Sequence, residues 1–145
     1  LVNKQMDKSS LDGIKVLELG QLIAGPFAAK TLADFGADVI KVEAPVTGDA
    51  LRKWRLLKDG TSVWWQVQSR NKRSIALDLK QSEGQDIVRQ LLLESDVLIL
   101  FDRTDLFHTM RLFPFPPIWQ LMKTRQYPQI VRCDSRNINI YAIPN

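Results

Sequence analysis

Residues 11–43, LDGIKVLELGQLIAGPFAAKTLADFGADVIKVE, place a helical pattern between two short apolar runs. The first run, Ile14–Leu19, and the second run, Ala37–Val42, both have the length of a strand. Between them, apolar residues recur at helical spacing over Pro26–Phe35, and Gly36 stands where the C-terminal end of a helix favours glycine. This order of a strand, a helix and a second strand predicts a βαβ unit with parallel strands.

The same alternation of short apolar runs and helical patterns continues to residue 101. Ser62–Gln68 and Lys80–Ser95 have helical spacing, whereas Ser74–Leu79 and Asp96–Phe101 have the length and apolar character of strands. Strands that alternate with helices predict an α/β fold, built on a mostly parallel sheet with flanking helices.

The composition changes near residue 100. All seven glycines lie at or before Gly84, and five of the seven prolines lie beyond residue 100. We therefore expect two regions, an α/β region at residues 1–100 and an irregular tail at residues 101–145. Two apolar runs of the tail have the length of short strands, Ile130–Cys133 and Ile138–Ile143.

Length and charge are those of an ordinary globular protein. The 145 residues include 45% hydrophobic and 25% charged side chains, and the net charge of +4 is too small to indicate a nucleic-acid-binding protein. No apolar run approaches the roughly 18–20 residues of a membrane-spanning helix. A single cysteine excludes an internal disulfide framework. We expect a cytoplasmic protein that binds neither nucleic acid nor a membrane.

The single histidine and the single cysteine, His108 and Cys133, support neither a metal site nor a nucleophile–base pair. Both residues lie in the tail, and no third group can be named that would complete a catalytic arrangement. A zinc site would need carboxylates as further ligands. We therefore expect no bound metal.

The segment Gly20–Gly25 follows a strand and precedes a helix, where backbone amides favour anions. Its spacing fits neither the GxGxxG dinucleotide fingerprint nor the GxxxxGK[ST] phosphate loop, because Pro26 and Phe27 follow the second glycine. Two interpretations stay open. The segment is either an anion-binding loop or a tight turn in which glycines allow the backbone to approach closely.

A basic segment at residues 52–73 carries seven cationic residues against the single acidic residue Asp59. If Trp54, Trp64 and Trp65 pack inward, these cations form a rim that can recognise phosphates. The alternative is a solvated basic loop. The residues of this basic rim are Arg52, Lys53, Arg55, Lys58, Arg70, Lys72 and Arg73.

Several motifs occur in a fixed order between residues 11 and 99. They are residues 11–19 (LDGIKVLEL), 24–29 (AGPFAA), 32–43 (LADFGADVIKVE), 70–75 (RNKRSI), 77–80 (LDLK) and 95–98 (SDVL). Together they resemble the N-terminal portion of the class III CoA-transferases. That group includes formyl-CoA transferase, carnitine CoA-transferase and α-methylacyl-CoA racemase.

The resemblance implies a partial Rossmann-like domain, a homodimer in the full-length protein, and transfer of CoA between an acyl-CoA and a carboxylic acid. The coenzyme A thioester would be a substrate, and no cofactor would be bound covalently. Ile23 and Ala24 match the strand-to-helix turn that approaches CoA. The expected contacts to the nucleotide part of CoA are Leu77, Asp78, Leu79 and Lys80, with Arg73 as a nearby cation.

The resemblance ends after Ile99. The family continues with an acidic residue, Asn-Phe and a Pro-Gly turn, whereas this chain continues with LFDR at residues 100–103. The family's catalytic Asp, which carries mixed-anhydride intermediates, has no counterpart, so no catalytic residue is assigned. We expect a truncated or frameshifted form without turnover of its own. The alternative is a non-enzymatic module that binds a nucleotide or a protein through the basic rim at 52–73.

Overall fold

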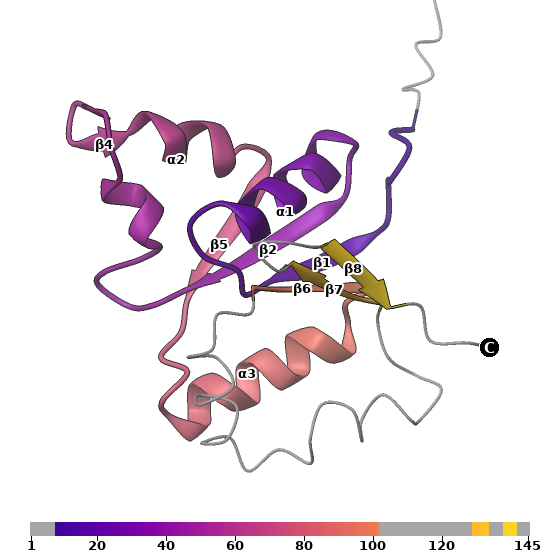
Figure 1. Ribbon diagram of the computed structural model, residues 1–145. Helices are drawn as coiled ribbons and strands as arrows, with labels where there is room; N and C mark the ends of the chain where they lie inside the picture. The colour runs from indigo at the N-terminus through magenta and orange to yellow at the C-terminus, as the bar shows by residue number, and fades with distance from the viewer. Residues whose placement is uncertain (1–7, 102–128, 134–137, 142–145) are drawn as a thin grey trace, which may run out of the picture.

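A six-stranded sheet forms the centre of the computed structural model, which describes residues 8–101, 129–133 and 138–141 (Figure 1). The strand order is β5-β2-β1-β6-β7-β8. All neighbouring strands are parallel except the last pair, β7 and β8, which is antiparallel. The strands are β1 (Lys15–Glu18), β2 (Asp38–Glu43), β5 (Lys72–Ala76), β6 (Val97–Phe101), β7 (Gln129–Cys133) and β8 (Ile138–Tyr141).

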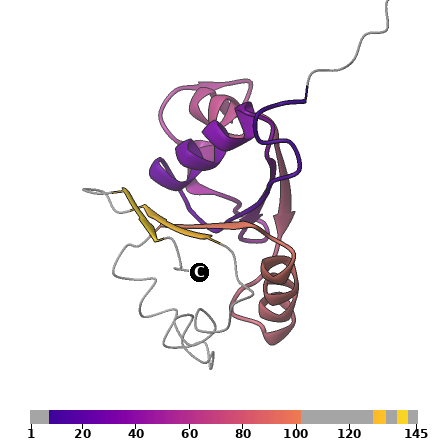
Figure 2. The same cartoon turned by 90° about the vertical axis from the view of Figure 1, so that its right-hand side faces the viewer.

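Helices cover both faces of this sheet, as a parallel sheet requires (Figures 1 and 2). Helices α1 (Ala24–Asp34) and α2 (Val63–Gln68) lie on one face, and α3 (Ser82–Leu93) lies on the other. Successive residues of a strand point to opposite faces, so Val16 packs in the core under α1 and Leu17 packs in the core under α3. The fold is therefore an α/β fold with two apolar layers around one sheet.

The order of the strands is Rossmann-like. In chain order, the first four parallel strands of the sheet are β1, β2, β5 and β6, and their spatial order is 3-2-1-4. The order reverses between β1 and β6, and folds of this kind bind ligands outside the carboxyl ends of the strands at such a point. A site is therefore expected at the carboxyl ends of the parallel strands, the edge at which β1, β2 and β5 also end.

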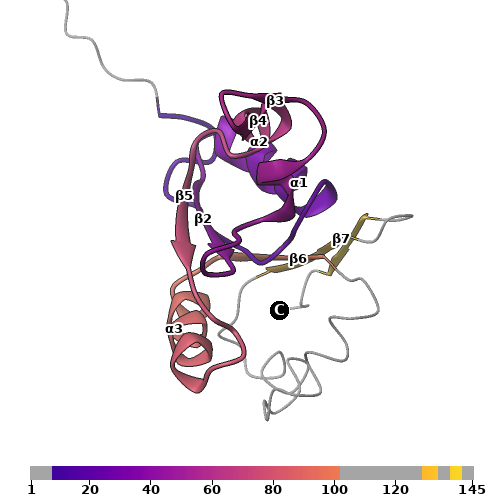
Figure 3. The ribbon, with the colours of Figure 1, turned by 90° about the vertical axis from the view of Figure 1, so that its left-hand side faces the viewer.

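The connection from β2 to β5 contains a small hairpin that the sequence analysis did not predict (Figure 3). Before the hairpin, the connection forms a 3₁₀ helix, η1 (Ala50–Lys53). The side chain of Asp49 caps this helix by accepting a hydrogen bond from the Leu51 amide. Strands β3 (Leu57–Lys58) and β4 (Thr61–Ser62) follow. Asp59 and Gly60 join them with φ angles of 51° and 77°, as the two central residues of a type I′ turn require.

The predicted helices and strands of residues 1–100 are all present, with boundaries shifted by a few residues. Helix α1 begins at Ala24, so Pro26 is its third residue and not its first, as the sequence analysis expected. Proline is tolerated there because the first amides of a helix have no intrahelical acceptor. Gly36 follows the helix with a φ of 99°, which confirms its predicted capping position.

Both strands predicted within residues 101–145 are also present, as β7 and β8, and they extend the sheet beyond β6. His108 lies outside the described residues, and only the backbone of Cys133 is described. Among residues 8–101, 129–133 and 138–141, no helix is long and apolar enough to cross a bilayer. No group of three or more His, Cys, Asp or Glu side chains is placed to hold a metal within the same residues.

Candidate functional site

Three loops meet at the carboxyl edge of the sheet, the edge formed by the carboxyl ends of β1, β2 and β5. Residues 19–23 follow β1, residues 44–49 follow β2 and residues 77–81 follow β5. A hollow of about 440 Å³ lies between the first two loops. It is lined by Gln21, Ala44, Thr47, Gly48, Asp49, Ala50 and Lys53.

The loop after β1 is a tight strand-to-helix turn, here called the β1–α1 turn and defined as Gly20–Pro26. Gly20 and Gly25 lie so close that a Cβ atom on either residue would be 2.7 Å from the other's Cα atom. Such a distance is far too short for a side chain, so both positions require glycine. The segment is therefore a tight turn, which is one of the two interpretations that the sequence left open. Phe27, which donates its amide to the Ile23 carbonyl at 2.8 Å, makes the first hydrogen bond of the helical ladder.

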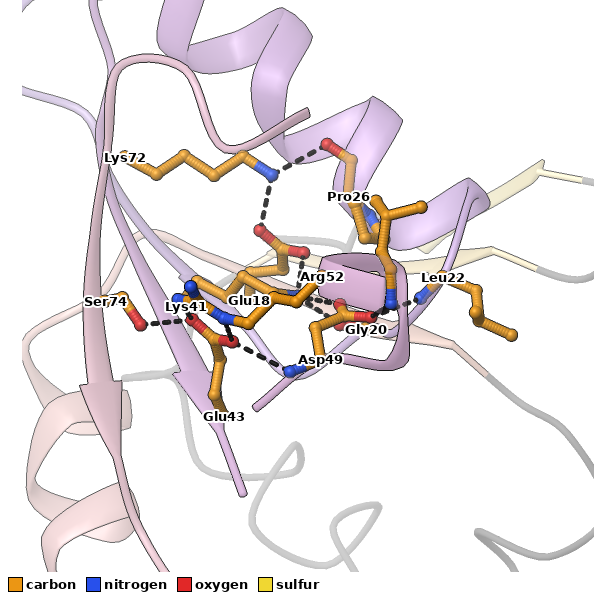
Figure 4. Close-up of polar contacts among 11 residues, drawn as sticks. Glu18, Gly20, Leu22, Pro26, Lys41, Glu43, Asp49, Arg52, Lys72 and Ser74 are labelled. Atoms are coloured by element: carbon orange, nitrogen blue, oxygen red, sulfur yellow. Dashed lines mark hydrogen bonds and ion pairs between the residues drawn. The ribbon is translucent and has the colours of Figure 1, made fainter. Parts of the chain in front are cut away.

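Four charged side chains are buried beneath this turn, on the face of the sheet that α1 covers (Figure 4). We call Glu18, Lys41, Asp49 and Lys72 the buried charge network. Each of these side chains is at most 2% exposed. Two positive and two negative groups balance one another, as buried charges must.

Lys41 stands at the centre of the buried charge network because β1 and β2 pair Glu18 with Lys41. Its Nζ atom donates to Glu18 Oε1 at 2.8 Å and to the Gly20 carbonyl at 2.7 Å. The same Nζ atom lies 2.8 Å from Asp49 Oδ2. This contact is an ion pair, and Asp49 Oδ2 accepts no hydrogen bond among the described residues. Lys41 thus joins two carboxylates and the beginning of the β1–α1 turn.

Lys72 holds the other end of the β1–α1 turn. Its Nζ atom donates to Glu18 Oε2 and to the Pro26 carbonyl, both at 2.8 Å. Burial lowers the pKa of Lys72, and the neighbouring Glu18 carboxylate opposes that effect. Each carboxylate oxygen of Glu18 therefore accepts a hydrogen bond from one lysine.

A third buried carboxylate, Glu43, lies at the end of β2 beside the buried charge network. Arg52 donates Nε to Glu43 Oε2 at 2.7 Å and Nη2 to Oε1 at 2.8 Å, and the Ser74 hydroxyl also donates to Oε1. The Asp49 amide donates to Oε2 at 2.8 Å. Burial raises the pKa of Glu43, but these donors together lower it to about 2. Glu43 therefore stays ionised and fixes the loop after β2.

Six of the seven site residues that the sequence analysis named lie at the carboxyl edge. Ile23 is 45% exposed, and Ala24 packs against the core at the start of α1. Leu77 is buried in the core under α3, and the half-buried Leu79 packs against the same core. Asp78 and Lys80 are exposed, and Asp78 Oδ1 accepts a hydrogen bond from the Lys80 amide at 3.0 Å.

Arg73 does not lie with the other six. Its register partner is Ile40, near the beginning of β2, and its guanidinium binds the carboxylate of Asp38 at the first position of that strand. Arg73 also lines a separate hollow of about 120 Å³ with residues such as Lys15 and Glu94. This position is at the amino end of the sheet, opposite the carboxyl edge.

Internal ion pairs reduce the charge of the basic rim. Four of its seven cations bind carboxylates from residues before 50, which a count of residues 52–73 does not include. These pairs are Arg52–Glu43, Arg70–Asp34, Lys72–Glu18 and Arg73–Asp38. Among the described residues, Lys53, Arg55 and Lys58 form no ion pair, and Arg55 lies over the Trp54 ring at 4.7 Å. Trp65 packs inward as expected, whereas Trp64 is 39% exposed.

The family model for CoA-transferase family III matches residues 11–110, so the match extends beyond residue 99. The succinyl-CoA–D-citramalate CoA-transferase of Chloroflexus aurantiacus is 46% identical over 99 residues, which cover 68% of this chain and 25% of that protein. Human succinyl-CoA:glutarate CoA-transferase is 43% identical over 90 residues, which cover 61% of this chain and 20% of that protein. The chain thus spans about a quarter of the length of these relatives.

The chain is also similar to one portion of larger solved structures. A CAIB/BAIF family protein from Brucella suis is 34% identical with a TM-score of 0.68, covering 88% of this chain and 33% of that protein. A hypothetical protein from Mycobacterium tuberculosis is 29% identical with a TM-score of 0.72, covering 90% of this chain and 35% of that protein. The fold described above is similar to one part of each of these larger structures.

Proposed function

Because this chain belongs to CoA-transferase family III, we propose that its carboxyl edge contacts coenzyme A. We propose further that the whole protein transfers CoA between an acyl-CoA and a carboxylic acid. The observation that carries the proposal is that Ile23, Ala24 and Leu77–Lys80 all follow strands that end at this edge of the sheet. These residues come from two segments more than fifty positions apart in the sequence. The hollow of about 440 Å³ lies at the same edge and is lined by neighbouring residues such as Gln21 and Lys53.

The chemistry of the carboxyl edge suits an anionic nucleotide. CoA carries phosphate groups, and the edge offers the exposed ammonium of Lys80 and the N-terminal end of α1. Lys53 lines the hollow and forms no ion pair among residues 8–101. We assign Lys80 the role of a phosphate or ribose contact, and the β1–α1 turn that of a backbone contact.

The CoA thioester is a substrate in this proposal and not a resident cofactor. In the reaction that the family resemblance implies, an Asp carboxylate attacks the thioester carbonyl, a mixed anhydride forms and the CoA thiolate leaves. The acceptor carboxylate then attacks the Asp carbonyl carbon of the anhydride and displaces the original carboxylate. The thiolate attacks the acyl carbon of the acceptor, which forms the new thioester and restores the Asp carboxylate. We assign this nucleophile to no described residue and propose that the 145-residue chain binds CoA without turnover. We also propose that the whole protein is a cytoplasmic homodimer.

Calorimetry with CoA tests the binding proposal. We expect saturable binding to the 145-residue chain, with an affinity that falls at least tenfold in Lys80→Ala. Lys58→Ala is the matched control, because Lys58 is an exposed lysine of the β3–β4 hairpin and belongs to none of the three loops of the carboxyl edge. Equal losses in the two variants would contradict the proposal. Binding of RNA or a protein without CoA binding would favour the module that uses the basic rim.

Acyl transfer is tested separately. The names of the relatives above include succinyl-CoA, so we propose succinyl-CoA as the first donor, with a panel of small carboxylic acids as acceptors. Chromatography of the CoA esters would detect a new thioester from the whole protein. Transfer by the 145-residue chain alone would show that the nucleophile lies within it and would contradict that part of the proposal.

A further inference from the structure

We propose that Lys41, Asp49 and Lys72 are positioning residues that hold the β1–α1 turn in the shape that contacts CoA. The inference rests on the proposed function, since it assigns a role to residues that lie behind the proposed contact. None of the three is expected to touch CoA, because their side chains are at most 2% exposed.

The three residues bind the turn at three separate points. Lys41 Nζ donates to the Gly20 carbonyl at 2.7 Å, at the beginning of the turn. Asp49 Oδ1 accepts the Leu22 amide at 3.1 Å, in its middle, where Leu22 has a φ of 63°. Lys72 Nζ donates to the Pro26 carbonyl at 2.8 Å, at its end (Figure 4). The turn is fixed over its whole length by side chains from β2, β5 and the loop between β2 and η1.

These residues are charged although their side chains are buried. A buried ion pair is often no more stabilising than apolar side chains of the same volume, so stability alone does not explain four buried charges. An apolar side chain at Lys41 or Lys72 could fill the space but could not bind a carbonyl oxygen. The unusual backbone of Leu22 also needs a partner to hold it, because non-glycine residues rarely adopt positive φ angles. The charges are therefore best explained by the backbone groups that they hold.

Glu18 joins the two lysines, and among the described residues its side chain makes no hydrogen bond to the turn. It accepts Lys41 on one oxygen and Lys72 on the other, both at 2.8 Å. Glu18 is thus the common counter-ion that lets two cations be buried beneath one short loop. Removing Glu18 together with Lys72 leaves Lys41 balanced by Asp49, and this offers a variant with no net buried charge.

The test compares CoA affinity with stability in two kinds of variant. Lys72→Met removes the bond to the Pro26 carbonyl, and Glu18→Gln/Lys72→Met does so while it keeps the buried charges balanced, in case the single variant does not fold. Leu98→Ala is the control, because Leu98 is buried under α3 on the opposite face of the sheet. Denaturant unfolding gives the stability of each variant, calorimetry gives its affinity for CoA, and hydrogen exchange follows the Leu22 and Phe27 amides.

We expect the Lys72 variants to bind CoA at least tenfold more weakly and to exchange the Leu22 and Phe27 amides at least tenfold faster. Leu98→Ala should lose stability but keep its CoA affinity within twofold. If affinity follows stability in all variants alike, or if the Lys72 variants bind CoA normally, the proposal is overturned. If the wild-type chain is folded and binds no CoA, the proposed function fails. In that case hydrogen exchange alone tests the positioning role, and unchanged exchange of the Leu22 and Phe27 amides in the Lys72 variants would refute it.

Discussion

Replacing Lys41 by Met should destabilise the fold more than any exposed substitution, because it leaves two buried carboxylates with too few cations. Lys41 is 1% exposed, and its Nζ atom lies 2.8 Å from both Glu18 Oε1 and Asp49 Oδ2. Breaking a buried ion pair by removing one partner costs about 3–5 kcal/mol. A domain is stable by only about 5–15 kcal/mol, so the loss should be large but measurable.

A double-mutant cycle with Asp49→Asn isolates the electrostatic part of this loss. An Asn at position 49 keeps an Oδ1 acceptor for the Leu22 and Leu51 amides that Asp49 binds at 3.1 Å and 2.8 Å, and it removes only the charge. Lys41→Met/Asp49→Asn leaves Glu18 and Lys72 as one balanced pair. The double variant should therefore cost about 1–3 kcal/mol less than the sum of the single variants.

Urea unfolding at neutral pH, followed by far-ultraviolet circular dichroism, measures all three variants. Lys58→Met is the control of identical chemistry at an exposed position, and it should change the free energy of unfolding by less than about 0.5 kcal/mol. If the loss of unfolding free energy in the double variant equals the sum of the two single losses within about 0.5 kcal/mol, the reasoning is refuted, because Lys41 and Asp49 would then not be coupled.

Three further predictions concern stability. Gly25→Ala should destabilise by about 1–2 kcal/mol, since its Cβ atom would lie 2.7 Å from the Gly20 Cα atom, and a neutral result in urea unfolding would contradict the tight turn. Ser62→Ala should cost about 1–2 kcal/mol, because its hydroxyl caps α2 at the Trp65 amide and donates to the Trp54 carbonyl at 2.8 Å; an unchanged melting temperature would argue against that cap. Glu43 has a folded pKa of about 2, below its ordinary 4.5, so its contribution to stability is complete above pH 4.5 and is lost as the pH falls towards 2. Glu43→Gln should flatten this part of the stability profile, and an identical slope in both proteins would exclude Glu43 as its source.

Local patterns predicted the α/β fold because each element of residues 11–101 carries its own signal. The apolar runs at Ile14–Leu19 and Ala37–Val42 are buried on both faces, so they remain apolar along most of their length. Gly36 marks the end of α1 because only glycine adopts its φ of 99° easily. The hairpin was missed although Asp59-Gly60 is a typical type I′ turn, because its strands are only two residues long.

The buried charge network could not be predicted because it depends on contacts between residues far apart in the sequence. Glu18 and Lys72 are 54 positions apart, and only the strand order places them on one face. The signal that was present is a charged residue inside an apolar strand, at Glu18 and Lys41. For the same reason a local charge count overestimated the basic rim, and it could not tell that Arg73 lies at the amino end of β5 while Lys80 lies beyond its carboxyl end.

The central claim is that CoA binds at the carboxyl edge, and titration of the ¹⁵N-labelled chain with CoA tests it most directly. We predict that the largest changes in amide chemical shift lie in residues 20–24, 44–49 and 77–80, with little change at Arg73 or in the β3–β4 hairpin. A folded chain whose amide shifts do not change, or change mainly in the hairpin and α2, would contradict it.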